Sequence, residues 1–140
     1  MKILVYCEHS KGKIKKGSLE LLSNVANWAG TETHAILLGA PGSLDALTNE
    51  VKEYGAAQIH LAEHTSLANY APEAFAKIVA DTAKALGVDA LLTSVSAQTK
   101  DFFPRTAVKL DTGMASDCTE LNLNGAALNA RRPMYSGKCY

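Results

Sequence analysis

The 140-residue sequence lacks an excess of charge of either sign, because fourteen acidic residues balance fourteen basic ones. A chain without net charge has no field that would attract nucleic acid or an anionic membrane, so neither is expected as a partner. Long apolar runs are also missing. The run that begins at Lys2 ends at Glu8 and His9, too early for a signal peptide or a membrane span. We therefore expect a cytoplasmic protein that does not insert into membranes.

Cysteine is sparse, and its spacing excludes the usual redox and zinc motifs. Cys7, Cys118 and Cys139 are far apart and odd in number, and no C-x-x-C pair occurs. His60 and His64 are four residues apart, but the sequence places them at a strand end and a turn rather than on one helix face. The expectation is buried, reduced thiols and no metal site.

The common signatures of nucleotide binding and catalysis are absent as well. The stretch from Gly12 to Ser18 is a near miss to a phosphate-binding P-loop, but Gly17 passes directly to Ser18 without the required lysine. No G-x-G-x-x-G follows the first strand, and no nucleophile elbow is present. We predict no catalytic residue and a protein that is not an enzyme in itself. The lysines of this stretch fit a solvated loop.

Short apolar runs alternate with helical periodicity along the chain. The predicted parallel strands are Lys2–Cys7, His34–Leu38, Gln58–Leu61 and Val88–Thr93. Later, Met114–Leu123 and Ala127–Arg132 are predicted as two strands joined at Asn124-Gly125, a pair suited to a tight turn. The pattern predicts an α/β fold of the doubly wound, Rossmann-like kind. It has a parallel sheet, helices on both faces and an antiparallel strand pair near the C-terminus.

The helices between these strands have recognisable end signals. Ser18, Ser43 and Asp101 are predicted as N-caps, and Pro104 as a residue tolerated in the first turn of its helix. The clearest helix is Pro72–Leu86, with proline in its first turn and glycine directly after its end.

In an open parallel sheet, ligands bind beyond the carboxyl ends of the strands, where the strand order reverses. If the order is 3-2-1-4, the loops after strands one and four meet at that point. The second loop carries the candidates for a nucleotide or anion site, which are Ser94, Ser96, Thr99 and Lys100. A helix N-terminus there would favour an anion. The same residues also fit a solvated loop that caps a helix, and both readings stay open.

The segment Ser94–Arg105, continued through Leu110 to Thr119, resembles the electron-transfer flavoprotein alpha family. It has a small-residue loop, Lys100-Asp101, Pro104-Arg105, an Ala-x-x-Leu stretch and then Ser116-Asp117. The start of the chain, Ile3-Leu4-Val5 followed by Glu8-His9, and the close at 132–138 are similar too. The resemblance covers nearly the whole chain in the order of the family.

This resemblance implies an N-terminal scaffold and partner-interaction domain spanning residues 1–140. The complete alpha subunit would pair with a beta subunit and carry electrons through one FAD, from dehydrogenases to a quinone reductase or another acceptor. In that family the FAD sits mainly on a C-terminal domain of alpha, which this sequence does not reach. The chain stops at Tyr140 directly after a strand-like stretch, as if cut from a longer protein. We therefore expect no FAD on these 140 residues, and a colourless chain.

Four residues are candidates for the partner interface, namely Arg105, Asp117, Arg132 and Tyr135. Arginine and tyrosine are common anchors of interfaces, and Arg105 could instead form a local ion pair. Two alternatives belong to other classes: an independent small AMP- or ATP-binding protein of the same fold, and a stand-alone alpha-related module that regulates or binds a partner.

Overall fold

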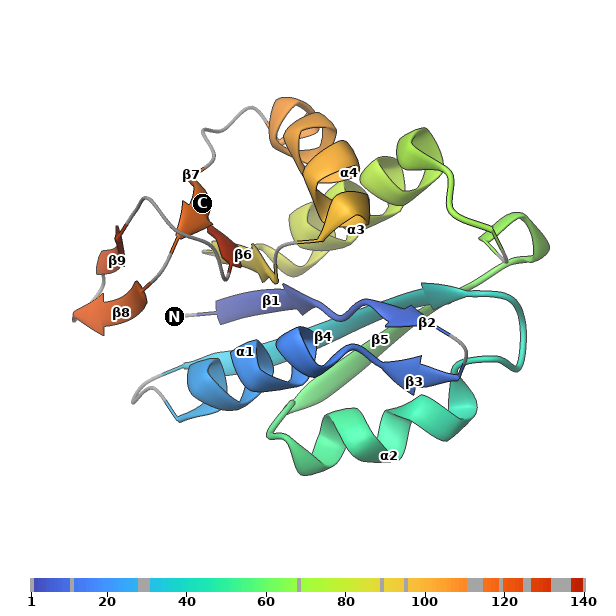
Figure 1. Cartoon of the computed structure of the whole chain (residues 1–140), viewed down its shortest axis with the longest axis horizontal. Coiled ribbons are helices and arrows are strands. Elements are labelled where there is room, and N and C mark those ends of the chain that lie inside the picture. Colours follow the sequence, from blue (N-terminus) through green and yellow to red (C-terminus); the bar gives the residue numbers. More distant parts are fainter. Residues whose placement is uncertain are drawn as a thin grey trace.

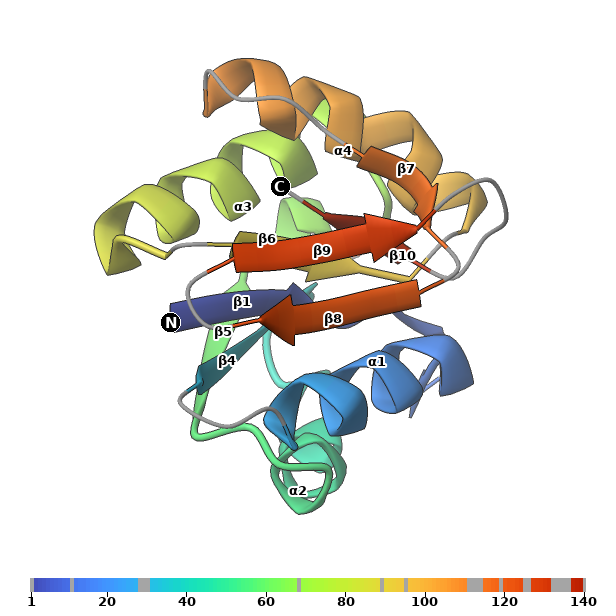
Figure 2. The same cartoon turned by 90° about the vertical axis from the view of Figure 1, so that its left-hand side faces the viewer.

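The computed structural model describes residues 2–10, 12–27, 31–67, 69–88, 90–94 and 96–110, and the backbone of 115–118, 120–124, 127–131 and 137–139. Figures 1 and 2 show its arrangement from two sides. The strands are β1 (Lys2–Tyr6), β2 (His9–Ser10), β3 (Lys13–Ile14), β4 (Glu32–Gly39), β5 (Gln58–Glu63), β6 (Ala90–Thr93), β7 (Ala115–Cys118), β8 (Glu120–Asn124), β9 (Ala127–Arg131) and β10 (Gly137–Cys139). The helices are α1 (Lys16–Ala26), α2 (Asp45–Glu53), α3 (Pro72–Leu86) and α4 (Ala97–Lys109), with a 3-10 turn at Thr65–Leu67.

The main sheet has the strand order β5-β4-β1-β6-β10-β7. Its first four strands are parallel, in the order 3-2-1-4 considered from the sequence. The last two run antiparallel to their neighbours. The doubly wound α/β prediction is therefore confirmed.

Helices cover both faces of the sheet, with α1 and α2 on one side and α3 and α4 on the other (Figure 1). Alternate residues of β1 point to opposite faces, so Ile3 and Val5 pack in the cluster with α1 and α2 while Leu4 and Tyr6 pack with α3 and α4. Because both faces are covered, the central strands are apolar at nearly every position.

The predicted ends of α3 are confirmed, and three predicted N-caps are wrong. In α3, Pro72 lies in the first turn and Gly87 ends the helix in the left-handed conformation, as predicted. The N-cap predictions at Ser18, Ser43 and Asp101 are wrong: Ser18 and Asp101 lie inside α1 and α4, and the residue before α2 is Leu44.

Pro104 lies inside α4 rather than in its first turn, because the helix begins four residues before Asp101. The Pro104 side chain is on the exposed side of the helix, opposite the buried Phe102 and Phe103.

The C-terminal strands also differ in part from the prediction. Residues 114–123 were expected to form one strand, but they contribute two, β7 and β8. The predicted antiparallel pair is present, since β8 pairs with β9 and Asn124 is the partner of Ala127. It forms a separate two-stranded sheet, and β10 and β7 are the strands that extend the main sheet.

Candidate functional site

The strand order reverses between β1 and β6, which are neighbours in the sheet. After β1 the chain reaches α1 on one face, and after β6 it enters α4 on the other (Figure 1). The carboxyl ends of the two strands therefore form the position at which this fold class places its ligands. Of the stretch predicted as a solvated loop, Lys13–Ile14 form β3, which pairs with β2, and Lys16 begins α1. The described lysines of this stretch are exposed, as predicted.

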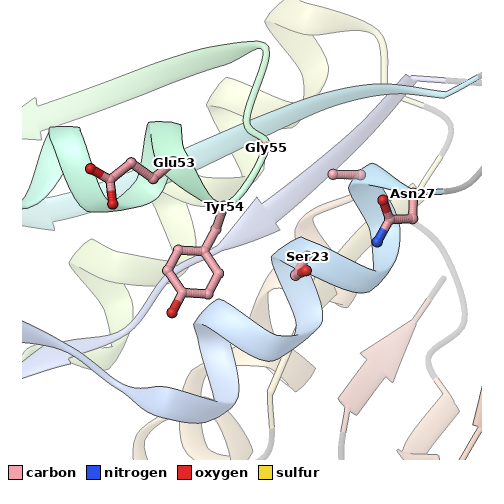
Figure 3. A pocket seen from close by; sticks show the side chains of 6 residues that line it. Ser23, Asn27, Glu53, Tyr54 and Gly55 are labelled. Atoms are coloured by element: carbon pink, nitrogen blue, oxygen red, sulfur yellow. The ribbon is translucent and has the colours of Figure 1, made fainter.

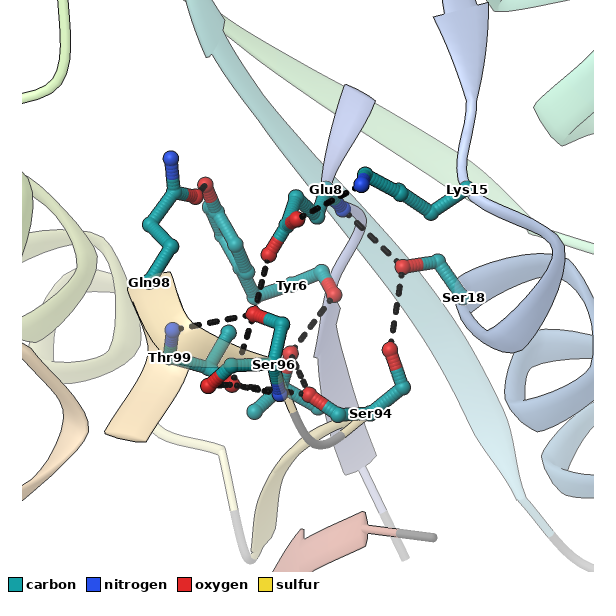
Figure 4. A network of polar contacts seen from close by, with 9 residues as sticks. Tyr6, Glu8, Lys15, Ser18, Ser94, Ser96, Gln98 and Thr99 are labelled. Atoms are coloured by element: carbon teal, nitrogen blue, oxygen red, sulfur yellow. Dashed lines mark hydrogen bonds and ion pairs between the residues drawn. The ribbon is translucent and has the colours of Figure 1, made fainter. Parts of the chain in front are cut away.

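Ser96 is the N-cap of α4 and forms a capping box with Thr99. The Ser96 Oγ atom accepts the Thr99 amide at 3.1 Å, and the Thr99 Oγ1 atom accepts the Ser96 amide at 2.9 Å. Thr99 then donates its own hydroxyl proton to the Ser94 carbonyl at 2.9 Å. Two of the residues predicted as candidates to bind an anion thus cap the N-terminus of α4 (Figure 4).

The carboxylate of Glu8 lies at the same helix end, although the sequence prediction did not include it. Its Oε1 atom accepts the Ser96 hydroxyl at 2.5 Å, and its Oε2 atom lies 3.8 Å from the Nζ atom of Lys15 (Figure 4). Glu8 is only 6% exposed. A negative group at this place is stabilised by the partial positive charge of the helix N-terminus.

The other side of the site is formed by the first turn of α1. Ser18 accepts the Glu8 amide at 3.0 Å, and its hydroxyl lies 3.4 Å from that of Ser94. Gly17 lies so close that a Cβ atom there would be 3.2 Å from the Cβ atom of Ser94. The α1 and β6 segments therefore meet almost without space between them.

Tyrosine hydroxyls connect this network to α4. Tyr6 is buried and donates to the side-chain oxygen of Gln98 at 2.6 Å. Burial, with the Glu8 carboxylate as a smaller cause, raises the pKa of Tyr6 well above its ordinary value. Tyr70 donates to Asp101 at 2.8 Å; its pKa is also raised, first by desolvation and then by that carboxylate.

Arg105, the centre of the sequence motif, lies on the exposed side of α4. Its Nη1 atom is 2.5 Å from Oε1 of Glu73 on α3, and its Nη2 atom is 4.0 Å from Asp101. The side chain remains 47% exposed. The structure thus gives Arg105 the local ion pair considered from the sequence, and its interface role stays a prediction.

The remaining sequence candidates are less well placed. Lys100 is exposed and follows Thr99 in the first turn of α4. The backbone of Asp117 belongs to β7, but its side chain is outside the described residues, as are Arg132 and Tyr135. Their predicted roles are not tested.

A hollow of about 530 Å³ lies between the ends of α1 and α2 (Figure 3). Ser23, Ala26 and Asn27 line it from α1, and Glu53, Tyr54 and Gly55 from the end of α2. Most of these lining residues have polar side chains, namely Ser23, Asn27, Glu53 and Tyr54, so the hollow lacks the predominantly apolar lining of a typical small-molecule site.

Three further findings concern chemistry outside these places. Among the described residues, no three His, Cys, Asp or Glu side chains converge to hold a metal ion. Cys7 is buried, and its burial raises the pKa of the thiol to about 12, so it is not a reactive thiolate. No helix within the described ranges is long and apolar enough to cross a membrane.

The sequence pointed to two loops that do meet in the structure, but it did not name Tyr6, Glu8 and Ser18 among the candidates. One available signal was the carboxylate that directly follows the buried first strand, at the edge where the strand order reverses.

Comparison with known proteins identifies the family. The family model described as the electron transfer flavoprotein domain matches residues 3–140. The chain is 31% identical to "Protein FixB" of Clostridium saccharobutylicum and 29% identical to the electron transfer flavoprotein subunit alpha of Clostridium acetobutylicum, over 96% of its length in both cases. It is also 30% identical, over 87% of its length, to the acryloyl-CoA reductase electron transfer subunit beta of Anaerotignum propionicum.

The chain spans 41% of the length of each of the first two relatives and 34% of the third. The resemblance to alpha subunits predicted from the sequence is confirmed by the names of these relatives. The chain belongs to the electron transfer flavoprotein family.

Proposed function

We propose that residues 1–140 form a scaffold and partner-interaction domain of an electron transfer flavoprotein alpha subunit. The observation that carries this proposal is the family match over residues 3–140, together with relatives named as alpha subunits over 96% of the chain. The complete protein would pair with a beta subunit and carry electrons from dehydrogenases, through FAD, to a quinone reductase or another acceptor. It would do so in the cytoplasm.

The FAD of that complete protein is proposed to bind outside these residues. The relatives are more than twice as long as the matched region, which leaves most of their length for a flavin-binding domain. Within this chain, the polar groups at the strand carboxyl ends are engaged with one another, as the bonds of Ser96 and Thr99 show. This chain is proposed to have no catalytic site of its own and to act by positioning its partners.

Electron delivery to or from a redox enzyme is the role proposed for the complete protein. One relative is named as an electron transfer subunit of acryloyl-CoA reductase, which favours a redox enzyme as the exchange partner.

Coexpression with the electron transfer flavoprotein beta subunit of the same genome tests the proposal. We expect the two chains to elute together in size-exclusion chromatography, and the 140-residue chain alone to show no flavin absorbance. Stoichiometric flavin on the isolated chain would contradict the proposed division of labour.

Calorimetry with AMP and ATP tests the alternative, an independent nucleotide-binding protein. The proposed function predicts no heat of binding. Tight binding that is lost in Ser94→Ala or Lys100→Ala would favour the alternative instead.

A further inference from the structure

The buried carboxylate of Glu8 occupies the place where a doubly wound fold usually binds an anion. It lies at the N-terminus of α4, a thirteen-residue helix, and beside the point of strand-order reversal. Helix amides at such an end have no partners within the helix and favour negative charge. Here the negative charge comes from the protein itself, through the bond from Ser96 to Glu8 (Figure 4).

The hydroxyl protons of Ser96 and Thr99, at this helix end, are already used. Ser96 donates its proton to Glu8, and Thr99 donates its proton to the Ser94 carbonyl. Each hydroxyl has one proton to donate, so neither has another for a ligand oxygen. An incoming phosphate would meet a carboxylate in place of donors.

The positive group of the site is engaged too. The Lys15 ammonium lies 3.8 Å from the Oε2 atom of Glu8, and this contact draws it toward the internal carboxylate. Without Glu8, the same ammonium and the Ser96 hydroxyl would lie together at the positive N-terminal end of α4. This is the combination of groups that binds phosphate in proteins.

We propose that Glu8 is the internal anion of this crevice and determines that the strand-reversal point of this domain takes no phosphate group. The inference does not rest on the electron-transfer role. It would hold for any function of the chain, and it fails or stands separately from partner binding.

The test is titration of the 140-residue chain with inorganic phosphate. Binding is measured by calorimetry and by the NMR shifts of the amides of residues 96–99. The variants are Glu8→Ala and, as a control with the same change in net charge, Glu50→Ala on the exposed side of α2. We expect Glu8→Ala to bind phosphate at least about tenfold more tightly than wild type and the control, since a like charge is removed from the site. Adding Lys15→Ala to Glu8→Ala should abolish most of this gain.

Two results would overturn the proposal. One is a folded Glu8→Ala protein whose phosphate affinity equals that of Glu50→Ala. The other is wild-type protein that already binds phosphate with shifts at residues 96–99. Should Glu8→Ala fail to fold, Glu8→Gln, which keeps the size and loses the charge, decides the question: a gain in phosphate affinity supports the proposal and no gain refutes it.

Discussion

The Nδ1 atom of His34 lies 2.9 Å from the Nε2 atom of His60, and the two imidazole rings stack with planes 13° apart. His34 is buried on β4, and His60 is partly buried on β5. On the other side of His34, its Nε2 atom is 3.2 Å from the carboxylate of Glu32, an electrostatic contact rather than an aligned hydrogen bond. The hydrogen bond between these two facing nitrogens holds one proton. If both nitrogens carried a proton, two N–H groups would point at each other.

The first prediction concerns the pH dependence of stability that follows from this pair. Desolvation, and to a lesser extent the charge of His34, lowers the pKa of His60. A lowered folded-state pKa means that the unfolded chain binds the proton more readily, so stability is full above about pH 6.5 and declines as the pH falls below it. Urea unfolding at a series of pH values should show this decline in wild type and a weaker one in His60→Gln.

The control for this experiment is His64→Gln, because His64 is exposed and its side chain bonds only to the nearby Ser66 among the described contacts. It should retain the wild-type decline. An unchanged pH profile in His60→Gln would show that the pair does not control acid stability. Below about pH 4.5, protonation of the Glu32 carboxylate adds a further loss of stability, since the pKa of Glu32 is lowered, first by its contact with His34.

The second prediction concerns the cap of α4. Ser96→Ala removes the acceptor for the Thr99 amide and the donor to the buried Glu8 carboxylate. Loss of an N-cap costs about 1 kcal/mol and an unsatisfied buried group about 1–3 kcal/mol, so a total near 2 kcal/mol is expected from denaturant unfolding.

Ser43→Ala is the matched control for that substitution. Ser43 was predicted as an N-cap, but it is exposed and donates its hydroxyl to the Ala40 carbonyl in a turn. Its loss should change the free energy of unfolding by less than about 0.5 kcal/mol. Equal effects of the two substitutions would mean that the Ser96 network adds no stability.

The third prediction concerns the aromatic cluster between the sheet and α3. The Phe102 ring is fully buried and contacts Tyr6 edge-on at a centroid distance of 5.0 Å, with Phe75 and Phe103 within 5.9 Å. Phe102→Ala should destabilise the protein by about 3–5 kcal/mol, the usual range for a deleted core phenylalanine. Val108→Ala on the same helix is the control, since Val108 is 80% exposed and should cost little. Comparable unfolding midpoints of the two variants would show that the aromatic cluster does not form the core between the sheet and α3.

The fourth prediction separates the two possible roles of Arg105. As a surface ion pair with Glu73 it should contribute less than about 1 kcal/mol, so Arg105→Ala should leave thermal unfolding nearly unchanged. If Arg105 is instead an interface anchor, Arg105→Ala should weaken binding of the beta subunit by tenfold or more, since the loss of such an anchor typically costs about 2 kcal/mol. Lys109→Ala on the same exposed side provides the comparison. Beta-subunit affinity equal to that of Lys109→Ala would remove Arg105 from the interface candidates.

The strands could be predicted from the sequence more accurately than the helix ends. The parallel strands were predictable because runs such as Ile3–Val5 are apolar on both faces, which only a covered sheet explains. The helix starts were not predictable in the same way. Ser18 and Asp101 are residue types that favour N-cap positions, but they lie inside α1 and α4. Ser18 instead accepts the Glu8 amide inside the first turn of α1, a contact fixed by tertiary packing.

The candidate site was predictable as a place and not as a set of bonds. The expected strand order put the loops after β1 and β6 together, so Ser94, Ser96 and Thr99 could be named as neighbours at this edge of the sheet. Glu8 was missed because its partner Ser96 is 88 residues away in the chain, beyond any local pattern. The motif around Arg105 identified the family, although its residues there bond mostly to each other and to α3.

The most direct test of the central claim is light scattering during size-exclusion chromatography of the chain coexpressed with its genome's electron transfer flavoprotein beta subunit, with visible absorbance recorded on the same run. The account predicts a complex of the two chains, and a chain that is free of flavin when run alone. Separate elution of two folded chains, or flavin bound to the 140-residue chain by itself, would contradict it.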